Sequence, residues 1–139
     1  MMRFMIMVRA NKDTEADVKP DESLIAEMVT YHEELAKAGA LVDASGLQPS
    51  CKGWRIRYSG KKRSVLDGPY AEAKELIAGY TIIEAKSREE ALEWTKRFPN
   101  PFPNGQESEI EVRPIKGLEE LGDSDAVQRF RDLGVGTQK

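Results

Sequence analysis

Two segments of this sequence are apolar on both faces when they are considered as β-strands. Successive side chains of a strand point to opposite sides of its sheet. In residues 4–8 (Phe-Met-Ile-Met-Val) both alternating sets of side chains are apolar, and residues 76–85 contain one charged side chain, Glu84. The sheet that contains these two strands must therefore be covered on both of its faces.

Two predicted helices can cover one of these faces. Residues 21–38 predict a helix with Asp21 as its N-cap and Gly39 just after its end, and a second helix begins at the capping residue Ser87 and ends before Pro99. Residues 11–19 are expected to form a polar loop. The apolar stripe of the first helix consists of Leu24, Met28, Tyr31 and Leu35, with His32 at its edge.

The order of the elements predicts an α+β fold of ferredoxin-like type, with both helices on one face of an antiparallel sheet. This arrangement leaves the opposite face of the sheet bare. A second copy of the chain is the simplest cover for it, so we predict a homodimer. The other predicted strands are residues 40–43, 54–58, 63–66 and 107–115, and residues 54–58 alternate as in a half-buried strand.

Composition excludes several classes of protein. The chain has 139 residues and a net charge of −3 with acids and bases well mixed, so neither nucleic acid nor a membrane is expected as a partner. Cys51 is the only cysteine, which excludes an internal disulfide and favours a cytoplasmic protein. With His32 as the only histidine, a structural zinc site is also excluded, and no metal is predicted. The apolar run 4–8 is too short for a signal peptide or a membrane span.

His32 and Asp67 are the candidate catalytic pair. An imidazole titrates near neutrality and a carboxylate can orient it, which is what general acid/base chemistry requires. Asp67 precedes Gly68 and Pro69, whose sequence predicts a tight turn at the rim of the sheet. Two other interpretations stay open: Asp67 caps this turn, and His32 is a core histidine bonded to a backbone carbonyl.

Four further residues near this turn are candidates for ligand binding. Tyr70 and Trp54 are expected as walls of a cleft between the sheet and the first helix, whose polar groups are Asp67 and His32. Glu72 and Lys74 are alternative candidates for binding a polar ligand. Surface ion pairs and solvation explain Glu72 and Lys74 equally well. A basic hairpin beside Trp54 is expected to be a charged sheet edge, and it consists of Arg55, Arg57, Lys61, Lys62 and Arg63.

Several stretches of the chain carry a family resemblance. They are residues 46–49 (Gly-Leu-Gln-Pro), 67–75 (Asp-Gly-Pro-Tyr-Ala-Glu-Ala-Lys-Glu), 79–80, 90–94 and 111–115. Together they resemble the DGPF-domain branch of the YCII-related proteins, with Tyr70 where the family name has phenylalanine. The resemblance covers residues 2–115. We therefore predict a YCII-related domain over residues 1–115 and an extension over residues 116–139 that includes a short helix.

The resemblance implies a dimeric α+β barrel, whose biochemical role in this family is mostly unassigned. It also implies a histidine on the first helix that faces an aspartate across a cleft, which would be His32 and Asp67. The wider superfamily includes lyases, isomerases and cofactor-free oxygenases, and DGPF proteins often accompany alternative sigma factors. Two functions are open. The first is binding of a small organic molecule near Asp67, with lyase-like or isomerase-like acid/base chemistry and no cofactor. The second is a non-catalytic interaction or regulatory module linked to sigma-factor-dependent transcription.

Overall fold

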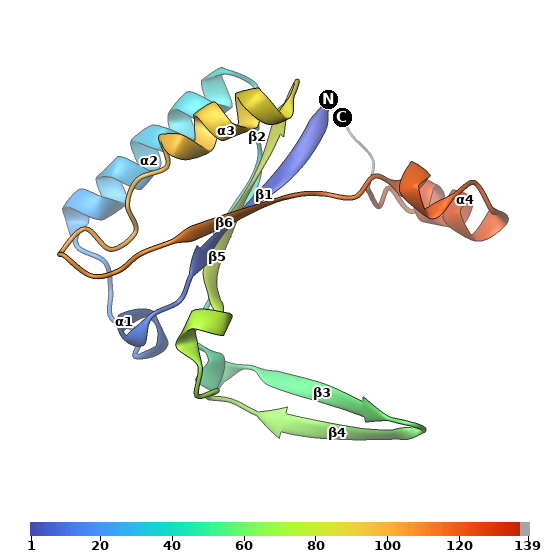
Figure 1. The fold of residues 1–139 in the computed structure, drawn as a ribbon, viewed down its shortest axis with the longest axis horizontal. Coiled ribbons are helices and arrows are strands. Elements are labelled where there is room, and N and C mark those ends of the chain that lie inside the picture. The colour runs from blue at the N-terminus through green and yellow to red at the C-terminus, as the bar shows by residue number, and fades with distance from the viewer. Residues whose placement is uncertain (137–139) are drawn as a thin grey trace.

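The computed structural model describes residues 1–136, and its main element is an antiparallel four-stranded sheet with the strand order β2-β5-β1-β6 (Figure 1). This order confirms the predicted α+β fold of ferredoxin-like type. Residues 137–139, the end of the predicted extension, lie outside the described part. The strands are β1 (Met2–Arg9), β2 (Leu41–Gly46), β5 (Ile77–Ala85) and β6 (Ile110–Pro114).

Helices α2 (Glu22–Lys37) and α3 (Arg88–Lys96) lie side by side on one face of this sheet (Figure 1). Both begin at the predicted caps. The Asp21 carboxylate accepts a hydrogen bond from the Leu24 N–H at 2.9 Å, and this bond holds the pKa of Asp21 below its usual value. The Ser87 hydroxyl accepts from the Glu90 N–H at 3.1 Å. Local capping therefore sets where both helices start.

The core lies between these helices and the sheet. The Tyr31 hydroxyl, at the centre of α2, donates to the Trp94 carbonyl of α3 at 2.7 Å. Burial raises the pKa of Tyr31 to about 12. The contact joins the two helices while it satisfies a buried hydroxyl. The core residues are Phe4, Ile6, Tyr31, Leu35, Ala40, Ile83, Ala85 and Ala91.

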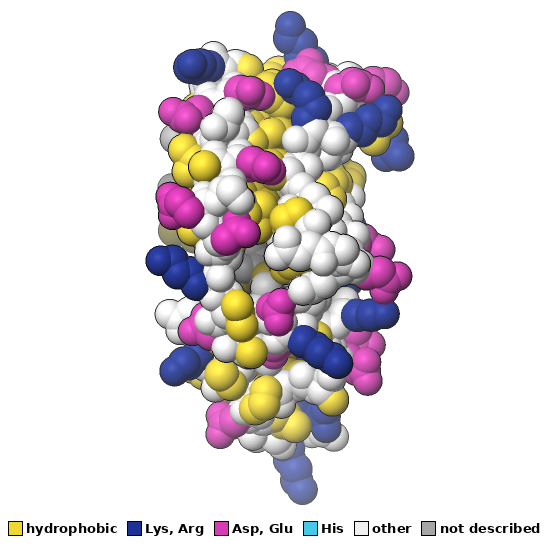
Figure 2. All heavy atoms as spheres, turned by 90° about the vertical axis from the view of Figure 1, so that its left-hand side faces the viewer, with side chains coloured by type: hydrophobic (Ala, Val, Ile, Leu, Met, Phe, Trp, Pro, Cys, Tyr) yellow, Lys and Arg dark blue, Asp and Glu magenta, His cyan; other side chains and the backbone are white. Residues whose placement is uncertain are grey.

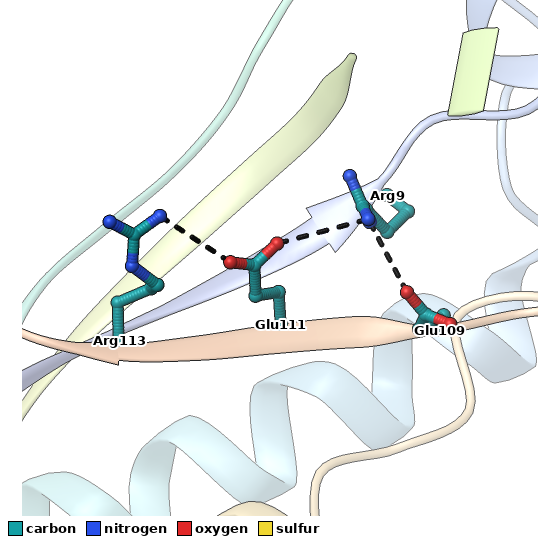
Figure 3. A network of polar contacts seen from close by, with 4 residues as sticks. All are labelled: Arg9, Glu109, Glu111 and Arg113. Carbon is teal, nitrogen blue, oxygen red and sulfur yellow. Dashed lines mark hydrogen bonds and ion pairs between the residues drawn. The ribbon is translucent and has the colours of Figure 1, made fainter. Parts of the chain in front are cut away.

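No helix of the described residues covers the opposite face of the sheet (Figure 1). We call it the open face. Its centre is apolar and partly exposed, and its edge along β6 is charged: Arg9 contacts Glu109 at 3.3 Å and Glu111 at 3.8 Å, and Glu111 contacts Arg113 at 3.5 Å (Figure 3). The apolar centre consists of Met5, Met7, Tyr80 and Ile82.

Strands β3 (Trp54–Ser59) and β4 (Lys62–Asp67) form a separate two-stranded sheet. This hairpin extends away from the body on the side opposite the helices (Figure 1). The register places Trp54, Ile56, Tyr58 and Val65 on one face, and all four are exposed. The prediction of a half-buried strand at residues 54–58 is therefore wrong for the single chain, because the hairpin does not join the main sheet.

The remaining elements are short. Residues 11–19, predicted as a loop, contain the one-turn helix α1 (Lys12–Glu15), in which Asn11 and Thr14 cap each other. Past β6 lie η3 (Leu118–Leu121) and α4 (Asp125–Asp132), which pack against each other on the same side as the hairpin (Figure 1). Two 3₁₀ turns, η1 (Ser50–Lys52) and η2 (Ala73–Glu75), flank the hairpin in the chain. Within residues 1–136, no helix is long and apolar enough to cross a membrane.

Candidate functional site

A cavity of about 770 Å³ lies between α2 and the β2–β5 side of the sheet, and we call it the α2 cavity. Seen from the helix-covered side, hydrophobic side chains reach the surface between acidic and basic ones (Figure 2). The wall of the cavity is largely apolar, which is typical of small-molecule sites. It includes Leu24, Ile25, Met28 and Val29 of α2, Leu41 and Ala44 of β2, and Phe98 and Phe102 from the segment after α3.

His32 lines the α2 cavity, and both of its ring nitrogens are hydrogen-bonded. Nδ1 lies 2.7 Å from the Met28 carbonyl oxygen, one turn earlier in α2. Nε2 lies 2.8 Å from Oγ1 of Thr81, which comes from β5 and also lines the cavity. The ring meets Tyr31 and Phe98 edge to face, with centroids 5.6 and 6.3 Å apart. Hydrogen bonds and packing therefore hold the imidazole in one orientation.

The partners of His32 determine which nitrogen carries the proton. A carbonyl oxygen can only accept, so Nδ1 is the N–H donor to Met28. In the neutral ring Nε2 is then an acceptor, and the Thr81 hydroxyl donates to it. This arrangement leaves a basic nitrogen at the cavity wall, with a hydroxyl in contact with it.

Thr81 is the functional residue that sequence reasoning missed. It was placed in the apolar strand 76–85, and it is the one hydroxyl on the face of that strand that also carries Ile83. Thr81 is only 3% exposed. A buried hydroxyl needs a polar partner, so its position on a core face was the available signal.

Asp67 lies outside the α2 cavity. It ends β4, is exposed, and pairs in register with Trp54 of the hairpin. The structure does not bring the predicted pair together, because the ring nitrogens of His32 bond to Met28 and Thr81 instead. His32 was interpreted either as a catalytic residue or as a core histidine bonded to a backbone carbonyl. The structure shows that it bonds to a backbone carbonyl and also lines a cavity.

The turn after Asp67 anchors the hairpin to the body. The Gly68 N–H donates to the Gly53 carbonyl at 3.1 Å, and the Tyr70 N–H donates to Ser50 Oγ at 3.2 Å. Ser50 is in turn held by Glu15, whose carboxylate accepts from the Ser50 N–H at 3.0 Å and from its hydroxyl. Residues far apart in the sequence thus meet at this turn, which has a structural role.

Tyr70 belongs to this anchor and does not line the α2 cavity. Its hydroxyl donates to the Leu66 carbonyl at 2.8 Å, and the Arg55 guanidinium lies 3.6 Å from the centroid of its ring. Trp54, the other predicted wall, is 66% exposed on the hairpin. The structure therefore places neither aromatic ring beside His32.

Glu72 and Lys74 line a second cavity, of about 830 Å³, together with residues 9–12 and 106–109. Lys74 pairs with Glu107 at 3.8 Å, and both side chains are about nine-tenths exposed, at 88% and 94%. An ion pair so exposed to water contributes little to stability. Among residues 1–136, no group of three or more His, Cys, Asp or Glu side chains is placed to hold a metal ion.

Comparison with known proteins gives a family, one sequence relative and one solved structure. A YCII-related domain matches residues 2–118. An uncharacterized protein of Rhizobium meliloti (strain 1021) is 30% identical over 95 residues, which are 68% of this chain and 75% of that protein. Among solved structures, the 5-chloro-2-hydroxyhydroquinone dehydrochlorinase of Burkholderia phenoliruptrix AC1100, in complex with 2,5-dihydroxybenzoquinone, is 15% identical. That match covers 84% of this chain and 95% of the other, with a TM-score of 0.45.

Proposed function

The chain belongs to the YCII-related family, and we propose that it binds a small, largely apolar organic molecule in the α2 cavity. The observation that carries this proposal is a cavity of about 770 Å³ with an apolar wall and one oriented imidazole. Ligand sites of folded proteins typically have about this volume and combine apolar walls with few polar groups. We place the chain in the DGPF-domain branch of the family on the sequence of residues 67–75.

The chemistry that these groups favour is proton transfer without a cofactor. In an isomerase-like step, His32 Nε2 takes a proton from one atom of the ligand and returns it to another. In a lyase-like step, Nε2 takes the proton, the electron pair left behind forms a double bond, and the leaving group departs with its bonding electrons. The Met28 carbonyl orients the ring, which is the role predicted for Asp67. We therefore expect Asp67→Asn to leave ligand affinity unchanged.

A thermal-shift screen with small aromatic acids and phenols, followed by calorimetry on any hit, tests this proposal. Ala44→Phe on β2 adds a ring to the cavity wall and should weaken binding of a hit at least about tenfold through loss of space. Val65→Phe adds the same type of ring on the exposed hairpin and is the matched control. Equal affinities for the two variants would place the ligand elsewhere.

We also propose that the open face packs against the open face of a second copy, in a cytoplasmic homodimer. The hairpin and the segment with η3 and α4 both extend on the side of this face (Figure 1). An isolated two-stranded hairpin is marginally stable in water, so its exposed apolar face favours a partner. A reducing compartment suits the exposed, unpaired thiol of Cys51.

Sedimentation velocity at micromolar concentration tests the dimer. Met7→Asp places a charge at the centre of the open face and should convert the dimer to a monomer. Leu92→Asp changes an exposed leucine on the helix-covered side and should leave the dimer intact. A wild-type monomer would refute the assembly. A dimer that binds no ligand in the α2 cavity would favour the interaction module over the enzyme.

A further inference from the structure

We propose that the α2 cavity selects ligands that carry a hydrogen-bond donor, and that Thr81 Oγ1 is the atom that accepts it. This inference rests on the proposed function and specifies the chemical class of the ligand. It follows from the directions of two hydrogen bonds, those between His32 and Met28 and between His32 and Thr81.

The first step concerns the proton of the Thr81 hydroxyl. Because Nδ1 of the neutral His32 ring carries its proton toward the Met28 carbonyl, Nε2 can only accept. The single proton of the Thr81 hydroxyl is then committed to Nε2 across 2.8 Å. A hydroxyl oxygen whose proton is committed still has a free lone pair. Toward a ligand, Thr81 therefore acts as an acceptor.

The second step concerns the other polar groups of the cavity wall. Among residues 1–136, neither lysine nor arginine lines it, so a ligand carboxylate would meet no permanent cation from this part of the chain. The hydroxyl of Thr14, another lining residue, already donates to the Asn11 carbonyl at 3.0 Å, and Glu33 is itself an exposed acid. Burying an anion without a partner is costly. A neutral ligand with an N–H or O–H group fits this wall best.

The third step concerns the hydrogen bond between Thr81 and His32, which would link a bound ligand to the basic nitrogen of His32. A ligand donor bonded to Thr81 Oγ1 would be connected to His32 Nε2 through the hydroxyl. A proton can then leave the ligand for Oγ1 as the hydroxyl proton moves to Nε2, so that one O–H bond forms as another breaks. Thr81 would thus be a ligand contact as well as a partner of His32.

Three bicyclic probes of nearly equal shape test the selection: indole with an N–H donor, benzofuran with a ring oxygen, and indene with neither. At about pH 8, calorimetry should show indole binding roughly three- to tenfold tighter than indene. Benzofuran should gain nothing over indene. Equal affinities for indole and indene would overturn the inference while leaving the cavity as a ligand site.

Variants of Thr81 assign the preference to its hydroxyl. Thr81→Val keeps the shape but removes the oxygen, so the advantage of indole over indene should disappear, while Thr81→Ser should retain it. The ¹⁵N chemical shift of His32 Nε2 should change in Thr81→Val because the hydroxyl that donates to it is lost. In the wild-type protein, 1-methylindole, which lacks the N–H donor, should lose the advantage that indole has over indene. Failure of all three bicyclic probes to bind would overturn both the selection and the proposed function.

Discussion

Gly68→Ala tests whether the turn after Asp67 is the anchor of the hairpin. A Cβ atom on Gly68 would lie 1.9 Å from the Ser50 carbonyl oxygen and 2.6 Å from its carbon. Real Cβ contacts do not approach this closely, and both atoms belong to backbone. The backbone at residue 68 and the backbone at Ser50 must therefore move apart in the variant. This movement disrupts the hydrogen bonds of the anchor.

The expected cost follows from the contacts that this movement breaks. The bonds from Gly68 N–H to Gly53 and from Tyr70 N–H to Ser50 contribute about 1 kcal/mol each. Displacing Tyr70 from the Arg55 guanidinium adds about 0.5–1 kcal/mol. We expect the free energy of unfolding to fall by about 2.5–3 kcal/mol. A domain of ordinary stability stays folded after a loss of this size.

Chemical denaturation measures this loss, and hydrogen exchange locates it. Amides of β3 and β4 should lose protection in Gly68→Ala, while those of β5 keep it, because the core residues do not come from the hairpin. Gly53→Ala is the matched control, since its Cβ would meet only the Ser50 oxygen at an ordinary 3.8 Å. A change below about 0.5 kcal/mol in Gly68→Ala would refute the clash argument.

Two further predictions concern the core. Leu35→Ala should lower the free energy of unfolding by about 2–5 kcal/mol in chemical denaturation, because Leu35 is fully buried, whereas Leu92→Ala on the same side should cost less than about 1 kcal/mol. The pKa of Tyr31 is raised from 10.0 to about 12, so the folded state holds this proton more tightly and stability should fall as the pH rises from 10 toward 12. Tyr31→Phe should remove that part of the alkaline loss, and a wild type with unchanged stability over this range would contradict the shift.

The fold could be predicted from the sequence because hydrophobic periodicity and helix-capping residues indicate the same helices and strands. In β5 the predicted strand begins one residue early, and Asp21 and Ser87 begin their helices as expected. The separation of the hairpin from the sheet could not be predicted, because the alternation of Trp54, Ile56 and Tyr58 is the same in a main-sheet strand and in a free hairpin.

The candidate site was only half predictable. His32 could be identified because it is the only histidine of the sequence and histidine is the usual acid/base residue of active sites, and it lines the cavity. The sequence paired it with Asp67, whereas its ring nitrogens bond to Met28 and Thr81 in the structure. The distance between α2 and the turn after Asp67 depends on long-range packing that no local pattern encodes. Thr81 was missed for the same reason, as its bond to His32 joins residues 49 positions apart.

The alternation of β5 makes neighbouring positions serve opposite sides of the molecule. Thr81 faces the helices and the α2 cavity, while Ile82, the next residue, lies on the open face. If one residue were deleted just before Thr81, every earlier side chain of β5 would point to the opposite face of the sheet. If two residues were deleted, the earlier side chains would keep their original faces. Natural variation in the length of this strand should therefore occur in steps of two residues.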